Sequence, residues 1–130
     1  MTQNEKDLLL KDLCARLPYG VICKSVNFKD PAKLVSIDLD GPSHDVFFCT
    51  NDGGSMWNDY DDIKPYLFPM SSMTKEQKKE YAHILVMCGN LAYSQLLGMT
   101  VEDWLNKNNF DYRGLIPMGL ANDATGLNIY

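Results

Sequence analysis

Histidine and cysteine are the residue types whose spacing first suggests chemistry in this chain. The two histidines, His44 and His83, lie far apart in the sequence. His83 and Cys88 are five residues apart in a predicted helix, which places them about 140° apart around its axis, too far to share a metal ion. A zinc site would therefore have to close across the fold around a single histidine. We expect surface or half-buried histidines and no metal.

The four cysteines, Cys14, Cys23, Cys49 and Cys88, occur without C-x-x-C spacing, and each lies in an apolar stretch. This pattern favours buried, reduced thiols over disulfides or metal ligands. A cysteine nucleophile needs an adjacent base or a helix N-terminus. Cys14 instead falls near the C-terminus of a predicted helix, and no spacing suggests a triad. We predict no catalytic residue.

Two aspartate-rich stretches, DLDGPSHD and NDYDD, raise the possibility of a calcium loop. A loop starting at Asp38 would place Pro42 at its fifth position, and no glutamate closes it. Aspartates of solvated turns are the favoured interpretation. The stretch DGGS lacks the lysine and the helix that follow a phosphate-binding loop. The sequence therefore predicts no cofactor.

The strongest asymmetry in composition is an acidic middle. Residues 30–62 contain eight aspartates and one lysine, for a net charge of −7, whereas the whole chain carries −5. Direct nucleic-acid binding is therefore not expected. We expect these aspartates to occupy exposed loops and the polar face of a sheet. The candidate acidic surface consists of Asp38, Asp40, Asp45, Asp52, Asp59, Asp61 and Asp62.

Aromatic residues form two groups along the chain. One flanks the acidic turns from Trp57 to Phe68, and the other lies within DWLNKNNFDYRGLIPMGLAND, residues 103–123. Aromatic residues near arginine mark binding hot spots, but they also fill the cores of small domains, and we favour the core interpretation for most of them. The candidate partner-binding residues are Trp57, Tyr60, Tyr112 and Arg113.

The first half of the chain is predicted to form a helix followed by a sheet. Thr2 and Glu5 have capping-box spacing, and Leu9, Leu13 and Leu17 share one helical face. After a stop at Pro18 and Gly20, residues 19–68 contain four to five short strands. In KLVSIDL, strict alternation places Val35, Ile37 and Leu39 on the side opposite Leu34, and NDGG predicts a hairpin. Pro65 and Pro69 predict that the last strand lies at an edge.

Residues 72–121 are predicted to be mainly helical. Thr74 with Gln77 and Thr100 with Asp103 have the spacing of N-terminal caps. LAYSQLLG can extend the first of these helices as far as Gly98.

The stretch from Phe110 to Ala121 is predicted to fold back as core. Asn108 or Asn109 ends the preceding helix in a left-handed conformation. Asp111 is expected to cap one more helical turn, Gly119 allows a reversal, and Tyr112 and Arg113 lie nearest to solvent.

The fold class predicted from these elements is α+β. It has an N-terminal helix, a small antiparallel sheet or SH3-like barrel of four to five strands, and two to three C-terminal helices packed on it. Residues 1–130 are expected to form a single domain. No apolar run approaches the ~20 residues needed to span a bilayer, and the charged start lacks the features of a signal peptide. We expect a cytoplasmic protein without membrane contact. Its oligomeric state is open at this point.

Three phrases, DLCARLPYGV, IKPYLFPMSSMTKEQKKEY and DWLNKNNFDYRGLIPMGLA, occur in this order along the chain. As a set they resemble a family of short uncharacterised proteins from gut bacteria and their phages. The resemblance covers most of the chain, but residues 26–62 do not match closely. It implies a phage or mobile-element accessory gene and carries no activity, fold or site residues with it.

Three functional hypotheses follow. The first is a non-enzymatic protein-binding module with an unidentified protein partner, because no catalytic constellation is present. The alternative is an acidic mimic of nucleic-acid phosphates that inhibits a DNA-binding protein, which requires carboxylates aligned on one exposed face. The third is a small hydrolase, which requires a cleft that joins a histidine to carboxylates or a cysteine.

Overall fold

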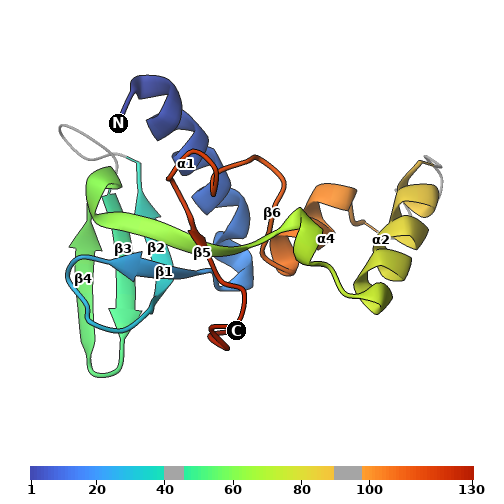
Figure 1. Cartoon of the computed structure of the whole chain (residues 1–130). Coiled ribbons are helices and arrows are strands. Elements are labelled where there is room, and N and C mark those ends of the chain that lie inside the picture. Colours follow the sequence, from blue (N-terminus) through green and yellow to red (C-terminus); the bar gives the residue numbers. More distant parts are fainter. Residues whose placement is uncertain (40–45, 90–97) are drawn as a thin grey trace.

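The computed structural model describes residues 1–39, 46–89 and 98–130. Helix α1 (Gln3–Arg16) lies against a sheet, and helices α4 (Val101–Lys107) and α2 (Lys75–Cys88) extend to one side of it (Figure 1). The helices α1, α2 and α4 each begin at a threonine cap, and the caps of α2 and α4 are complete capping boxes, as their spacing predicts. The predicted α+β class is confirmed. The expected extension LAYSQLLG falls mostly on residues 90–97, outside the described residues.

The five longer strands of the sheet run antiparallel in the order β4-β3-β2-β1-β5. A 3-10 turn, η2 (Tyr60–Asp62), precedes β5, which returns beside β1. Two short strands from the C-terminal part pair parallel with β5, so the sheet is mixed. The strands are β1 (Ile22–Ser25), β2 (Ala32–Asp38), β3 (Val46–Asn51), β4 (Gly54–Asn58), β5 (Ile63–Pro69), β6 (Phe110–Asp111) and β7 (Asn122–Asp123).

Strand β5 lies inside the sheet, so the edge position predicted from its prolines is wrong. Backbone polar groups point alternately to the two sides of a strand. The carbonyl of Asp62 accepts from Val26 on the β1 side, so Pro65, three residues later, directs its nitrogen away from β1. On that other side, β7 pairs only from Tyr66 onward. The missing N–H of Pro65 therefore faces no partner strand, and the strand tolerates it.

A bulge in β2 changes which residues face the core. Leu34 pairs with Cys49, but the next pair is Ser36 with Phe48, so Val35 and Ser36 together oppose Phe48. Leu34 is buried and Ile37 packs against the same core, whereas Val35 is 47% exposed. The predicted alternation, with Val35 and Ile37 on one side, is therefore wrong beyond Leu34.

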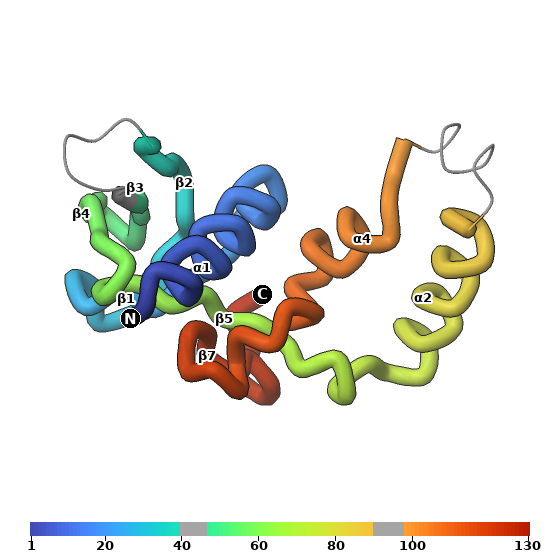
Figure 2. The backbone as a smooth tube through the Cα atoms, turned by 90° about the horizontal axis from the view of Figure 1, so that it is seen from above, coloured from blue at the N-terminus to red at the C-terminus, as the bar shows by residue number. Residues whose placement is uncertain are grey.

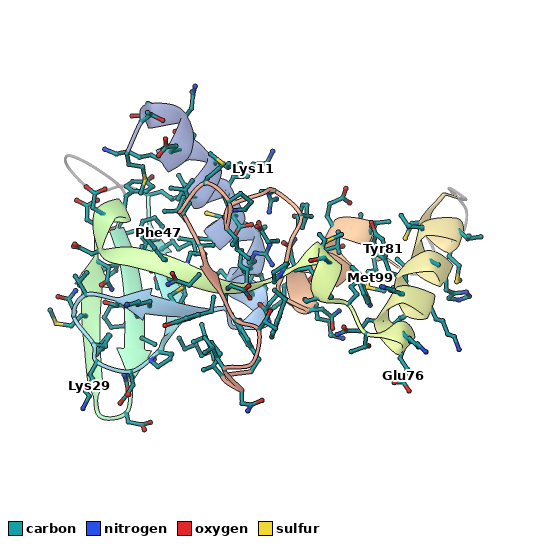
Figure 3. All side chains as sticks on the ribbon, viewed as in Figure 1. Lys11, Lys29, Phe47, Glu76, Tyr81 and Met99 are labelled. Atoms are coloured by element: carbon teal, nitrogen blue, oxygen red, sulfur yellow. The ribbon has the colours of Figure 1, made fainter. Side chains whose placement is uncertain are left out.

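Two hydrophobic clusters hold the elements together. The first fills the space between α1 and the sheet and includes Leu9, Leu13 and Phe47. The second cluster joins α4, Phe110 of β6 and the face of α2 that carries Tyr81. Figure 3 shows Tyr81 between α2 and α4, and Figure 2 shows α2 beyond α4, away from the sheet.

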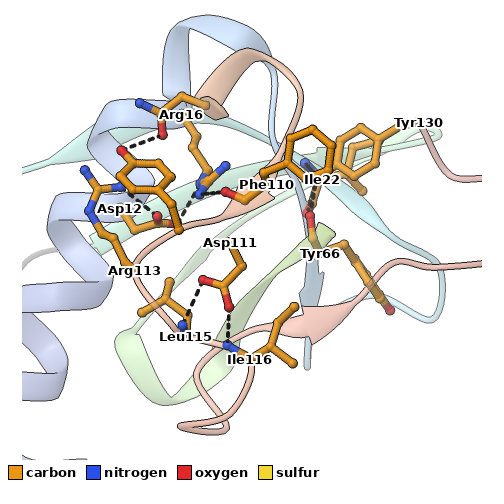
Figure 4. A network of polar contacts seen from close by, with 12 residues as sticks. Asp12, Arg16, Ile22, Tyr66, Phe110, Asp111, Arg113, Leu115, Ile116 and Tyr130 are labelled. Carbon is orange, nitrogen blue, oxygen red and sulfur yellow. Dashed lines mark hydrogen bonds and ion pairs between the residues drawn. The ribbon is translucent and has the colours of Figure 1, made fainter. Parts of the chain in front are cut away.

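The stretch from Phe110 to Ala121 belongs to the core, as predicted. Phe110 and Leu115 are almost completely buried, and the left-handed residues are Asn109 (φ 60°) and Gly119 (φ 75°). Asp111 does not cap a helix. Its two carboxylate oxygens accept from the backbone N–H groups of Leu115 and the following residue, at 2.8 and 2.9 Å, and so hold a turn (Figure 4).

Candidate functional site

The outer face of the sheet, opposite α1, carries a row of apolar side chains across three strands. The row consists of Val35 on β2, Phe48 on β3 and Trp57 on β4, and we call it the outer row. Phe48 pairs directly with Trp57, and their ring centroids are 4.9 Å apart. Trp57 remains 50% exposed. Single exposed apolar residues are ordinary, but a contiguous row with an aromatic pair is typical of an interaction surface.

Asn58 fixes the strand that presents Trp57. Its side chain is 2% exposed and points to the buried side of the sheet, so its neighbour Trp57 must point outward. The Asn58 amide oxygen accepts from the Ser25 hydroxyl and, at 2.8 Å, from Asn27 Nδ2. Its amide nitrogen donates to two backbone carbonyls of β3 and β4, each at 3.2 Å. The fully bonded amide ties β4 to the end of β1, and the outer row is thereby held in place.

The described aspartates lie at the two ends of the β3–β4 hairpin. Asp38 pairs with the first residue of β3, and Asp59 follows β4 at the same end. Asp52 lies in the hairpin turn at the other end, where the Asn51 side chain donates to the Asp30 carbonyl at 3.1 Å. The two ends are roughly 16 Å apart along β3. Asp61 and Asp62 belong to η2, while Asp40 and Asp45 lie outside the described residues.

An open cleft of about 550 Å³ lies on the hairpin-turn side of the outer row. Its lining includes Asp30, Lys33, Thr50 and Asp52. Lys33 and Thr50 are register partners, next to the Leu34–Cys49 pair. The cleft therefore combines two carboxylates with one ammonium group and adjoins the exposed apolar row.

The other predicted partner-binding residues are placed inside the fold. Tyr60 is 6% exposed and packs edge-on against Phe47 at 5.1 Å. Tyr112 is half-buried, and its hydroxyl donates to Asn106 at 3.1 Å. The Arg113 side chain is 14% exposed and lies over the Tyr112 ring at 4.5 Å. Of the four candidates, Trp57 is the one that offers a large open surface.

A buried ion-pair network joins α1 to the C-terminal part of the chain. Asp12 accepts from Arg16 Nε and from Arg113, both at 2.9 Å, and Arg16 also donates to the Phe110 carbonyl at 2.7 Å (Figure 4). The side chains of Asp12 and Arg16 are completely buried. The buried position of Asp12 was not predicted from the sequence. Its spacing from Leu9, at i+3, was the available signal.

The cysteines and histidines are not assembled for catalysis in the described part of the chain. Cys23 and Cys49 are buried, Cys88 is half-buried and Cys14 is exposed, so the prediction of four buried thiols is correct for two. Burial raises the pKa of Cys23 and raises that of Cys49 to about 11, so both thiols are protonated near neutral pH. His83 is exposed on α2, and His44 lies outside the described residues.

Across residues 1–39, 46–89 and 98–130, no three histidine, cysteine, aspartate or glutamate side chains are grouped so that they could hold a metal ion. Within the same ranges, no helix has the length and apolar character needed to cross a bilayer. No family model matches this chain, and neither a curated protein nor a solved structure is significantly similar to it.

Proposed function

We propose that the protein is a non-enzymatic binding module that contacts a protein partner through the outer row. The observation that carries the proposal is the Phe48–Trp57 pair on the outer face of the sheet, in which Trp57 is exposed and its strand is held by Asn58. Keeping half of a tryptophan side chain in water forgoes burial of apolar area that folding would otherwise use. A partner that covers the row would recover this energy.

The charge around the outer row indicates the chemistry of the partner. Aspartates lie at both ends of the hairpin, and the cleft beside the row contains Asp30 and Asp52. A surface with an apolar centre and flanking lysine or arginine side chains would complement this arrangement. The rim charges should mainly accelerate association and make it sensitive to salt.

The arrangement gives less support to a mimic of nucleic-acid phosphates. Asp38 and Asp59 lie at one end of β3 and Asp52 at the other, with an apolar row between them, while Asp61 and Asp62 belong to η2. A phosphate mimic needs a continuous line of carboxylates instead. The location in the cytoplasm and the setting in a phage or mobile element rest on the sequence and its resemblance, and they stay part of the proposal.

The test is a quantitative affinity capture from host lysate with three versions of the full chain. These are the natural sequence, Trp57→Ser, and Val86→Ser. The last is a control that removes an exposed apolar side chain, 76% exposed, from α2. We expect at least one protein to be retained by the natural chain and by Val86→Ser, and to be lost with Trp57→Ser. Its retention should fall as salt is increased. A partner that is kept by Trp57→Ser and lost with Val86→Ser would overturn the proposal.

A further inference from the structure

A second cleft, of about 200 Å³, lies where β1, η2, β5 and β7 meet. It is distinct from the outer row. Its lining includes Lys24 from β1, Lys64 from β5 and Asn122 from β7. Asp61 and Asp62 of η2 also line it. The cleft is smaller than the pockets of drug-sized ligands, so it suits a single small group.

Two lysines stand side by side in this cleft. Lys24 and Lys64 are direct register partners on antiparallel strands. Both are exposed, whereas their neighbours Cys23 and Pro65 are buried, so the two ammonium groups share the outer face. Like charges directly opposite each other destabilise a strand pair. Among the described residues, neither lysine forms an ion pair with a carboxylate, although Asp61 and Asp62 line the same cleft.

Asn122 adds a third donor. Its amide nitrogen is buried and has no hydrogen-bond partner among the described residues. A buried donor without an acceptor costs free energy that an acceptor in the cleft would recover. Lys24, Lys64 and Asn122 therefore line one small cleft, together with the carboxylates of Asp61 and Asp62, and none of the three nitrogen groups has a recorded acceptor among the described residues.

From this arrangement we propose that the cleft between Lys24, Lys64 and Asn122 binds a carboxylate group. A carboxylate carries one negative charge and has two acceptor oxygens for the three donors. A phosphate monoester carries about −1.5 to −2 charges at pH 7, and the neighbouring Asp61 and Asp62 would repel it more strongly. The mixed lining thus favours a singly charged acid over a phosphate. The carboxylate can belong to a small free acid or to the C-terminus of a peptide.

The test is an NMR titration of the full chain with acetate, methyl phosphate and methylammonium chloride at matched ionic strength. Acetate should shift the side-chain amide signals of Asn122 saturably and bind more tightly than methyl phosphate. Methylammonium chloride should give no saturable shift. A saturable response to neither anion, or tighter binding of methyl phosphate, would overturn the proposal.

Three variants sharpen the test. The double variant Lys24→Gln/Lys64→Gln should weaken acetate binding about tenfold, because each exposed charge contributes about threefold. The matched control Lys78→Gln/Lys79→Gln, on α2, should leave it unchanged. Asp62→Asn should strengthen methyl phosphate binding more than acetate binding. Equal weakening by both double variants would show a non-specific charge effect and contradict the site.

A further pair of probes distinguishes the two sources of the carboxylate. These are a short uncharged peptide with a free C-terminus and its amidated counterpart. Binding of the free peptide more tightly than acetate would assign the cleft to a chain terminus, and tighter binding of acetate would assign it to a small acid. Equal binding of the free and amidated peptides, together with no binding of acetate, would contradict the carboxylate site.

Discussion

The two tryptophans lie in regions of similar composition and opposite surroundings. Trp104 is 3% exposed and stacks against Tyr81 and Phe110, with centroids at 5.6 and 5.7 Å. Trp57 is 50% exposed and contacts the ring of Phe48 on the neighbouring strand of its own hairpin. Side chains from α2 and β6 converge on Trp104, whereas a single hairpin presents Trp57. Aromatic content therefore does not separate core from binding surface, but the number of converging segments does.

Charged groups follow the same division. In the buried region, Asp12 lies between Arg16 and Arg113, and the pairs are completed inside the protein. In the open region, the aspartates stand at the rim and the apolar row lies between them. A buried charge must find its partner within the fold because leaving it alone is costly. A charge at the rim keeps contact with water, so the fold depends less on any single partner for it. Substitutions in the two regions should therefore have different consequences.

The largest expected effect is the loss of Asp12. The change Asp12→Ala leaves Arg16 buried without its ion-pair partner and should lower the free energy of unfolding by about 3–5 kcal/mol. Urea denaturation measures it. The exposed Asp61, changed to alanine, serves as the control and should stay within about 0.5 kcal/mol of the natural chain. A loss below about 1 kcal/mol for Asp12→Ala would contradict a buried, paired carboxylate.

The next effect concerns the stretch from Phe110 to Ala121. Leu115→Ala should destabilise the protein by about 2–5 kcal/mol, because Leu115 is completely buried between α1 and the sheet. Met118→Ala, three residues later and 48% exposed, should cost about 0.5 kcal/mol or less. Thermal and urea unfolding of both variants compare them. Similar, small losses for the two would mean that the stretch is a surface tail.

A smaller effect is expected at Tyr130. Its hydroxyl accepts from the Ile22 N–H at 3.0 Å and donates to the Tyr66 carbonyl at 2.7 Å, bridging β1 and β5 (Figure 4). Tyr130→Phe should lower stability by about 1 kcal/mol near neutral pH.

The pH dependence of that difference is a second readout. Burial raises the pKa of Tyr130, so the unfolded chain ionises first as pH rises past about 10. The protonated Tyr130 hydroxyl therefore contributes its full stabilisation of the folded state below about pH 10, and this contribution decreases at higher pH. The difference between the natural chain and Tyr130→Phe should therefore shrink above about pH 10. Burial also raises the pKa of Cys23 and Cys49, but both proteins share that contribution. A difference that stays constant to pH 11 would argue against the bridge.

The smallest effect on stability is expected at Trp57. Trp57→Ala should change the free energy of unfolding by no more than about 0.5 kcal/mol, because the side chain is half in water and packs on one ring. Chemical denaturation measures it, with Trp104→Ala as the matched comparison at about 3–5 kcal/mol. Equal losses for both tryptophans would place Trp57 in the core and remove the basis of the proposed binding surface.

Local features of the fold were predictable from the sequence. The caps at Thr74 and Thr100, the hairpin at Asp52-Gly53 and the left-handed Asn109 all occur as expected. Each depends on a few neighbouring residues whose side chains bond to the adjacent backbone or tolerate an unusual φ. Such signals are contained in the sequence itself.

Features that depend on distant segments were not predictable. The bulge at Val35 turns Ile37 toward the core and leaves Val35 on the outer face, but it leaves no mark in an alternating apolar pattern. Asp12 and Arg16 have the spacing of an ordinary surface ion pair, and the approach of Arg113 from the far end of the chain makes them interior. The outer row was therefore visible in part, through Trp57, and its supporting residue Asn58 was missed.

The opposite placement of the two tryptophans is tested most directly by fluorescence quenching of single-tryptophan chains. Trp104→Phe leaves Trp57 as the only indole, and Trp57→Phe leaves Trp104. We predict that the Trp57 emission is red-shifted and strongly quenched by acrylamide in the folded protein. The Trp104 emission should be blue-shifted and protected until the protein unfolds. Equal protection of both indoles would contradict an open outer row, and with it the proposed binding surface.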